Sequence, residues 1–164
     1  MAWSQRSITI ATSAGVLVVL GVLLVVILHR PASPLPAAIS KQVRFAIYFP
    51  GKPWIVAPDE ASYQNGVLRF GSQQAGKQLV FTEQTTPPVF SEVPQYFPAL
   101  LAKMNQYASF GSASGTVYLT KPTELKGGQT AVVENAGTLL FVRPGRDLSD
   151  NEWRQLFSTM RTIE

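Results

Sequence analysis

The apolar residues of the chain follow two different patterns, and the first is an unbroken run near the N-terminus. Residues 8–28 make up 21 consecutive positions without a charge, and 14 of them are Ile, Leu or Val. As an α-helix this run is about 31 Å long, which matches a bilayer hydrocarbon core of about 30 Å. The pattern therefore predicts a transmembrane helix over residues 8–28, preceded by a short tail over residues 1–7.

A cleaved signal peptide is the alternative interpretation of this run. Secretory apolar segments usually span about 7 to 15 residues, and this one is longer, which favours a retained anchor. The orientation of the span can be judged from the basic residues near it. Arg6 is the only one on the N-terminal side, whereas Arg30, Lys41 and Arg44 follow the span. That count favours a cytoplasmic domain, whereas the short N-terminal tail is typical of a signal anchor. We expect the domain to lie outside the cytoplasm.

The second pattern is that of a folded domain, which begins after a proline-rich stretch. Residues 29–42 contain Pro31, Pro34 and Pro36 among small side chains, a composition that favours an extended spacer. From Val43 onward the apolar residues recur at short periods. We therefore expect a linker over residues 29–42 and a soluble domain over residues 43–164.

Alternating apolar and polar positions predict several β-strands in this domain. Asn65-Gly66 suits a type I′ turn and predicts a hairpin between two of them. Residues 50–53 predict a turn, since they read Pro-Gly-Lys-Pro. The predicted strands cover residues 43–49, 54–56, 61–64, 67–71, 77–84, 116–120, 130–134 and 138–143.

Two helices are expected, one in the middle of the domain and one at its end. Phe97, Leu100, Leu101 and Met104 have the spacing of one helical face, and this helix starts near residue 95 or 96. The second helix begins at a capping box formed by Ser149 and Glu152. Its apolar face consists of Trp153, Leu156, Phe157 and Met160, with Arg161 in the last turn. These elements predict an α+β fold: an antiparallel sheet with a short middle helix and a C-terminal amphipathic helix packed on one face.

Charge and composition exclude several functions. Net charge is +4, but from residue 42 onward 11 Lys and Arg oppose all 10 Asp and Glu. The folded part thus lacks the basic patch that nucleic-acid binding requires. The chain has no cysteine, and its one histidine, His29, lies at the predicted membrane boundary. We expect no cofactor and no metal.

Three motifs resemble catalytic or ligand-binding sites, and each has a structural explanation. Residues 71–77 have the spacing of a phosphate-binding loop, but Gln78 follows where Ser or Thr would hold magnesium, and a strand follows where a helix should begin. Residues 111–115 imitate a nucleophile elbow, but their centre is Ala113, and we interpret them as a flexible connection. Asp59-Glu60 is expected in a turn, and Asp147, Asp150 and Glu152 at a helix start. A hydrolase would need Asp59 or Glu83 beside Ser112 or Ser114.

The aromatic residues of the domain suit a core, or a ligand groove as the alternative. The seven residues concerned are Phe45, Tyr48, Phe49, Trp54, Tyr63, Phe70 and Phe81. We select Trp54, Tyr63 and Phe97 as the candidate ligand or partner surface.

The order of features resembles a family of small single-pass membrane proteins of unknown function from reduced-genome bacteria of the candidate phyla. The resemblance rests on VRFAIYFPGKPW, YQNGVLRF, LVFTEQTTPP, TLLFVR and WRQLFSTM, and it covers about residues 43–164. It implies an extracytoplasmic α+β domain and no catalytic residues.

We therefore expect a non-enzymatic, membrane-anchored interaction or accessory domain of the cell envelope. Its partners would be the lipid bilayer, through residues 8–28, and an envelope protein. A tethered small-molecule or lipid-binding module is the alternative, which predicts an apolar cavity lined by Trp54 and Phe97. The oligomeric state is left open.

Overall fold

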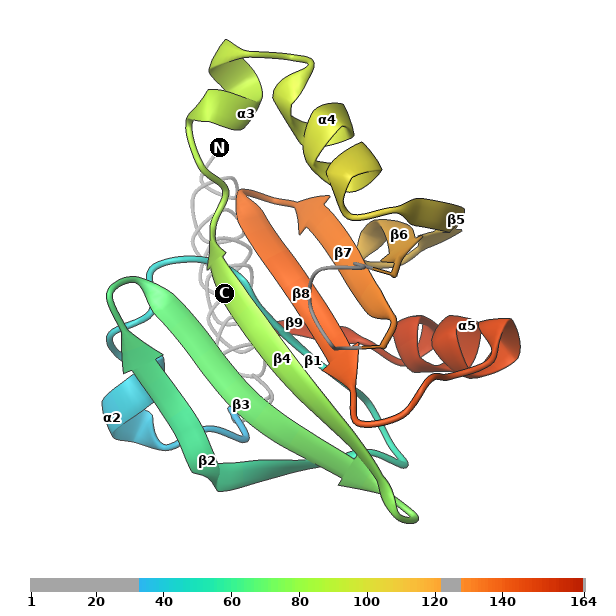
Figure 1. Cartoon of the computed structure of the whole chain (residues 1–164). Coiled ribbons are helices and arrows are strands. Elements are labelled where there is room, and N and C mark those ends of the chain that lie inside the picture. The colour runs from blue at the N-terminus through green and yellow to red at the C-terminus, as the bar shows by residue number, and fades with distance from the viewer. Residues whose placement is uncertain (1–32, 122–127, 164) are drawn as a thin grey trace, which may run out of the picture. The chain divides into compact units, whose positions relative to one another are not determined.

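The computed structural model describes residues 33–121 and 128–163, and these belong to one compact unit that begins at Ser33. The main element is a seven-stranded antiparallel sheet (Figure 1). Its strands, in spatial order, are β2 (Ile55–Gln64), β3 (Val67–Gln74), β4 (Lys77–Thr85), β8 (Thr138–Pro144), β7 (Thr130–Asn135), β6 (Gly115–Thr120) and β5 (Gln106–Ser112). The structure is mostly antiparallel sheet with few helices, as the sequence predicts.

Three tight turns set the register of the sheet. The predicted turn at Asn65-Gly66 joins β2 to β3, with φ angles of 52° and 77°. Ala75-Gly76 and Ala136-Gly137 have the same pair of positive φ angles and join β3 to β4 and β7 to β8. Such turns match the twist of the strands they connect. Residues 71–77 thus form a strand and a hairpin turn, as their structural interpretation predicted.

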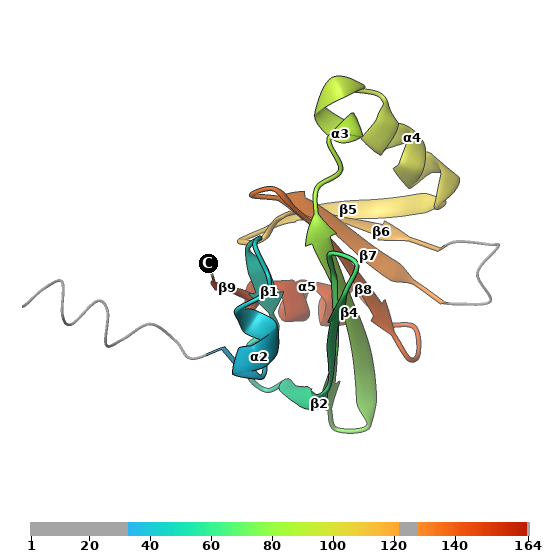
Figure 2. The same ribbon diagram turned by 90° about the vertical axis from the view of Figure 1, so that its left-hand side faces the viewer.

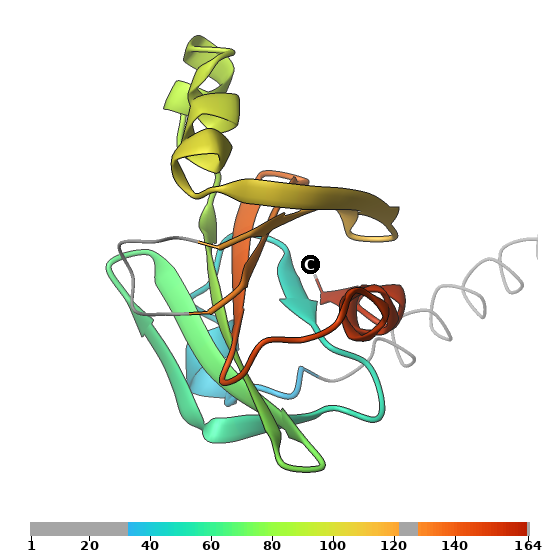
Figure 3. The same ribbon diagram turned by 45° about the vertical axis from the view of Figure 1, so that its right-hand side comes forward.

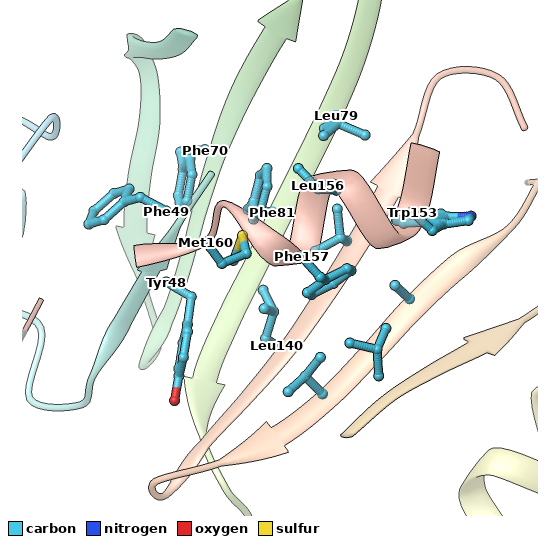
Figure 4. Packing of buried hydrophobic residues seen from close by; sticks show 14 of the residues in the cluster. Tyr48, Phe49, Phe70, Leu79, Phe81, Leu140, Trp153, Leu156, Phe157 and Met160 are labelled. Atoms are coloured by element: carbon cyan, nitrogen blue, oxygen red, sulfur yellow. The ribbon is translucent and has the colours of Figure 1, made fainter. Parts of the chain in front are cut away.

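The sheet curls around the main hydrophobic core (Figure 3). Inside the curve lie α5 (Asp150–Ser158) and a two-stranded sheet of β1 (Ile47–Phe49) and β9 (Arg161–Ile163). Trp153, Leu156 and Phe157 of α5 are fully buried against the strands (Figure 4). All seven aromatic residues expected in the core belong to this cluster or pack against it. The predicted capping box of Ser149 and Glu152 starts the helix.

A second, smaller core lies on the outer face of strands β6, β7 and β8. Successive residues of a strand point to opposite faces, and here both faces are covered. Ala131 and Val133 of β7 belong to the inner core, while Val132 belongs to the outer one together with Leu139 and Leu101. The outer core is covered by α4 (Tyr96–Lys103), the predicted middle helix, which follows the one-turn helix α3 (Val89–Glu92).

Several predicted elements differ in the structure. The strand expected over residues 43–49 is restricted to β1, which pairs with β9 and not with the main sheet. Residues 54–56 and 61–64 are parts of one strand, β2, and Asp59-Glu60 lies at its irregular centre instead of a turn. The C-terminal helix ends at Ser158, so Arg161 belongs to a strand and not to the last turn.

Residues 105–115 were predicted without a strand, but they contain the edge strand β5 and its hairpin to β6. The segment from Gln106 to Ser112 has a weak pattern, because its only large apolar residues, Tyr107 and Phe110, lie among small residues and do not alternate. Its neighbours in the sheet supply the stability that the sequence pattern does not reveal. The expected flexible connection over residues 111–115 is therefore a tight hairpin.

The described part of the predicted linker folds onto the domain. Residues 37–40 form the one-turn helix α2 (Ala37–Ser40), Leu35 is 5% exposed, and Ile39 packs against the main core. These contacts replace the extended conformation expected for residues 33–42.

The predicted transmembrane helix over residues 8–28 lies outside the described residues and stays a prediction. Within residues 33–121 and 128–163, no helix is both long and apolar enough to cross a membrane.

Candidate interaction surface

The three residues selected as a surface do not come together. Trp54 and Tyr63 pack against the main core, where the Tyr63 ring lies 6.4 Å from that of Phe45. Phe97 packs against the outer core, on the other face of the sheet. A single cavity lined by Trp54 and Phe97, as the small-molecule alternative requires, is not formed by this arrangement.

Phe97 instead belongs to a projecting element, the α3–α4 arm, which we define as residues 86–104. The arm connects β4, inside the sheet, to the edge strand β5 and rises above the sheet at one end of the domain (Figures 1 and 2). Its base is fixed by Leu101, which is buried, and by Phe97 and Met104, which pack on the same outer core. Phe90 of α3 also packs against this core.

Aromatic side chains stack along the arm from its base outward. The Phe97 ring makes an edge contact with Tyr118 of β6 at 5.6 Å between centroids. Phe90 of α3 lies 5.1 Å from Phe97 and 5.5 Å from Tyr96. Such ring pairs each contribute about 0.5–1.5 kcal/mol beyond the area they bury. The rings therefore join α3 to α4 and hold both on the sheet.

Prolines and local hydrogen bonds stiffen the arm. It contains Pro87, Pro88, Pro94 and Pro98, each of which fixes its φ angle. The amide of Val93 donates to the Val89 carbonyl at 2.9 Å, and the amide of Tyr96 donates to the Val93 carbonyl at 2.8 Å. The conformation of the arm is thus largely set before any partner arrives, which lowers the entropy cost of binding.

The outer end of the arm exposes large apolar side chains. Val93 is 47% exposed and Tyr96 is 45% exposed. The arm has one acidic and one basic residue, Glu92 and Lys103, and so no net charge. A stiff, neutral, apolar projection is suited to insertion into an apolar groove of another molecule.

Apolar residues that precede the predicted middle helix were a sequence signal for this surface. The predicted helical face accounts for Phe97, Leu100, Leu101 and Met104, whereas Val89, Phe90 and Val93 precede it among prolines. These additional apolar residues exceed what one short helix needs to cover the sheet. Val93 belongs to the exposed end of the arm, while Val89 and Phe90 are half-buried.

The most unusual ionisable group is Glu83, on the inner face of β4. Its side chain has no solvent exposure, and it lies between Leu68 and Leu140 of the neighbouring strands. The backbone amide of Tyr48 donates to both carboxyl oxygens, at 3.1 and 3.3 Å. Burial raises the pKa of Glu83 well above its ordinary value, and the amide of Tyr48 partly opposes that rise.

Glu83 has a structural role in this arrangement, because β1 is held on the sheet by side chains. Besides the contact with Glu83, the Thr138 hydroxyl donates to the Ala46 carbonyl at 2.8 Å. The Tyr48 hydroxyl donates to the backbone carbonyl of Asn135 at 3.3 Å and accepts from the side-chain amide of Asn135 at 3.2 Å. These bonds satisfy polar groups that would otherwise be buried without partners.

The groups of a hydrolase are engaged elsewhere in the described residues. The Ser112 hydroxyl donates to the Gly115 carbonyl at 2.8 Å and accepts from the Ser114 amide at 3.1 Å. Both bonds are internal to the β5–β6 turn, while the Glu83 carboxyl accepts from the backbone amide of Tyr48. The geometry therefore gives the serine motif a turn-forming role.

The acidic residues before α5 also have structural partners. Asp147 accepts from the Gln129 amide at 3.0 Å and from Lys121 at 2.8 Å. Glu152 accepts from Lys77 at 2.6 Å and closes the capping box. Lys77, the lysine of the phosphate-loop spacing, is thus bound to a carboxylate. Residues 33–121 and 128–163 contain no group of three or more His, Asp or Glu placed to hold a metal.

Comparisons with known proteins identify no relative: no family model, no curated protein and no solved structure matches the chain. The resemblance described from the sequence motifs accordingly stays a prediction.

Proposed function

We propose that this protein is a membrane-anchored, non-enzymatic interaction domain outside the cytoplasm, and that it binds a protein partner through the α3–α4 arm. The observation that carries the proposal is the exposed apolar end of a stiff projection, at Val93 and Tyr96. Apolar side chains of this size are costly to leave in water, by about 25 cal/mol per Å² of apolar surface. A partner that covers them gains that free energy on binding.

The folded position of residues 33–42 supports a short connection to the proposed anchor. If the span ends at residue 28, residues 29–32 alone separate it from the domain. The five Cα–Cα steps from residue 28 to residue 33 reach at most about 18 Å when extended. The domain would be held close to the bilayer by the end at which its chain begins.

The arm lies at the end of the domain opposite α2 and the start of the described chain (Figures 1 and 2). The stiff, apolar end of the arm favours a protein partner. Because the arm carries no net charge, the partner surface is expected to be an apolar groove.

Thiol labelling in intact cells tests the proposal, because the chain has no cysteine of its own. Ala113→Cys lies in the exposed β5–β6 turn, and Val93→Cys lies on the arm. We expect a membrane-impermeant maleimide to label Ala113→Cys in intact cells. Val93→Cys should be protected in cells and become reactive in the purified protein.

Either of two results would contradict the proposal. Labelling of Ala113→Cys solely after permeabilisation would place the domain in the cytoplasm. Equal reactivity of Val93→Cys in cells and in the purified protein would show that nothing covers the arm.

A further inference from the structure

The two edges of the seven-stranded sheet differ in how they are protected. An open edge presents unpaired N–H and C=O groups, and proteins usually guard it with proline, charge or a bulge. The β2 edge has all three, since Pro58, Asp59 and Glu60 lie where its register with β3 shifts. The β5 edge, residues 106–112, contains neither proline nor a charged residue, and its one register shift with β6 lies at its start, between Gln106 and Ala108.

The outward backbone groups of β5 follow from its register. Ser112 and Gly115 flank a two-residue turn and form a hydrogen-bonded pair. By alternation, Ser109 and Gly111 direct their N–H and C=O groups away from β6. Both residues are exposed. The strand therefore offers a row of hydrogen-bonding groups to a further strand.

The sequence of β5 is complementary to itself in one antiparallel register. A two-fold axis at Ser109 sets Phe110 opposite Ala108, so that a large side chain faces a small one. It also brings Tyr107, at the register shift of β5, towards Gly111. Tyr107 is 48% exposed, and the position of a side chain on Gly111 is open space. An aromatic residue opposite a glycine shields the exposed backbone of that glycine.

The next register is less favourable. A two-fold axis at Phe110 would place the Phe110 rings of the two copies side by side. In each copy the Arg154 guanidinium lies 4.8 Å from the centroid of this ring. Two arginines would then approach each other near the axis. Like charges held close together destabilise a strand pair, so the register centred on Ser109 is preferred.

We propose that a second copy of this chain pairs with the β5 edge, antiparallel and centred on Ser109, to form a continuous sheet across the dimer. The absence of charge on the strand removes the repulsion that would oppose self-pairing. This inference does not depend on the α3–α4 arm. If the proposed anchor is present, it would promote pairing by confining copies to one membrane.

Cysteine crosslinking of the full-length chain in its native membranes tests the pairing. In a hydrogen-bonded antiparallel pair the Cα atoms lie about 5.5 Å apart, within the range that a disulfide spans. Ser109→Cys should therefore form a covalent dimer under mild oxidation. Ala113→Cys, in the same hairpin, is the matched control, because its two copies would be separated by about 27 Å.

A faster and more complete dimer from Ser109→Cys than from Ala113→Cys supports the proposal, and equal or absent crosslinking overturns it. Ser109→Lys provides a second test, since it sets two positive charges opposite each other at an exposed position. We expect this variant to sediment as a monomer in detergent, whereas Ser109→Thr keeps the dimer. A Ser109→Lys chain that dimerises as well as the unaltered chain would contradict the proposed edge. Substitution of Val93, on the arm, should leave crosslinking unchanged.

Discussion

The backbone amide of Tyr48 donates a hydrogen bond to the buried carboxyl group of Glu83, with 3.1 Å between the nitrogen and Oε2. This contact joins two sheets, because Tyr48 belongs to β1 and Glu83 to β4. Glu83 is fully buried and forms no salt bridge within the described residues. The stability of the domain should therefore depend on the protonation of Glu83.

We predict that the unfolding free energy falls as pH rises above the ordinary Glu value of 4.5. The pKa of Glu83 is raised in the folded chain, which then binds more protons than the unfolded chain between the two pKa values. The stabilisation is complete below the unfolded pKa and is lost as pH rises through the folded one. Urea unfolding at a series of pH values measures this change.

Glu83→Gln is the control for that measurement, because the amide oxygen can still accept from Tyr48 but does not titrate. Other groups titrate alike in both proteins. The stability of the unaltered domain minus that of the variant should decrease as pH rises. A difference that is constant or increases between pH 4 and 8 would exclude the role assigned to Glu83.

Because of the salt bridge between Lys77 and Glu152, we predict that the domain loses stability at acidic pH. The pKa of Glu152 is lowered to about 2, first by the hydrogen bond from Lys77 and then by those from Ser149. Its contribution is present above the ordinary value of 4.5 and is lost as pH falls towards 2. An NMR titration should show Lys77→Ala raising this pKa more than Ser149→Ala does. The opposite order would assign the shift to the helix cap.

The turn at Ala75-Gly76 predicts a stabilising substitution. Ala75 has a φ of 45°, which is unfavourable for a residue with a Cβ, while Asn65 has the same role in the first hairpin. Ala75→Asn should raise the unfolding free energy by about 0.5–1 kcal/mol, since asparagine tolerates this region better. Thermal unfolding of the variant checks the change. A lower midpoint would contradict the assigned turn geometry.

The exposed end of the arm predicts a loss of binding without a loss of folding. Tyr96→Ala should weaken partner binding by about tenfold or more, because exposed aromatic residues often dominate an interface. Gln95→Ala, which alters an exposed polar neighbour, should have little effect. Co-purification from solubilised membranes gives the comparison. Gln95→Ala should unfold within about 0.5 kcal/mol of the unaltered chain, as surface substitutions usually do. Tyr96→Ala also loses the contact with Phe90 and should remain folded but be less stable by about 0.5–1.5 kcal/mol.

The elements that the sequence predicted correctly have strong local signals. The hairpin at Asn65-Gly66 depends on residues suited to positive φ angles. The C-terminal helix depends on a capping box that the structure contains as predicted. In both cases a few adjacent residues determine the local structure, so one sequence is enough to find it.

The elements that were missed depend on residues far away in the chain. Strand β1 is short because Glu83 and Thr138 bind the backbone near Tyr48, and no pattern in residues 43–49 reports these partners. Strand β5 is supported by β6, against which it forms a hairpin. Phe97, selected as a surface residue, packs on the outer core, and the exposure of Val93 and Tyr96 follows from the packing of the arm on the sheet.

Photo-crosslinking from the arm in intact membranes tests the central proposal most directly. A photoreactive residue at position 96 is compared with one at Asn151, an exposed position of α5. We predict one protein adduct of defined mass from position 96, absent from position 151 and lost when Val93→Ser is added. Adducts to lipid, the same adducts from both positions, or no adduct from position 96 would contradict a protein partner bound at the arm.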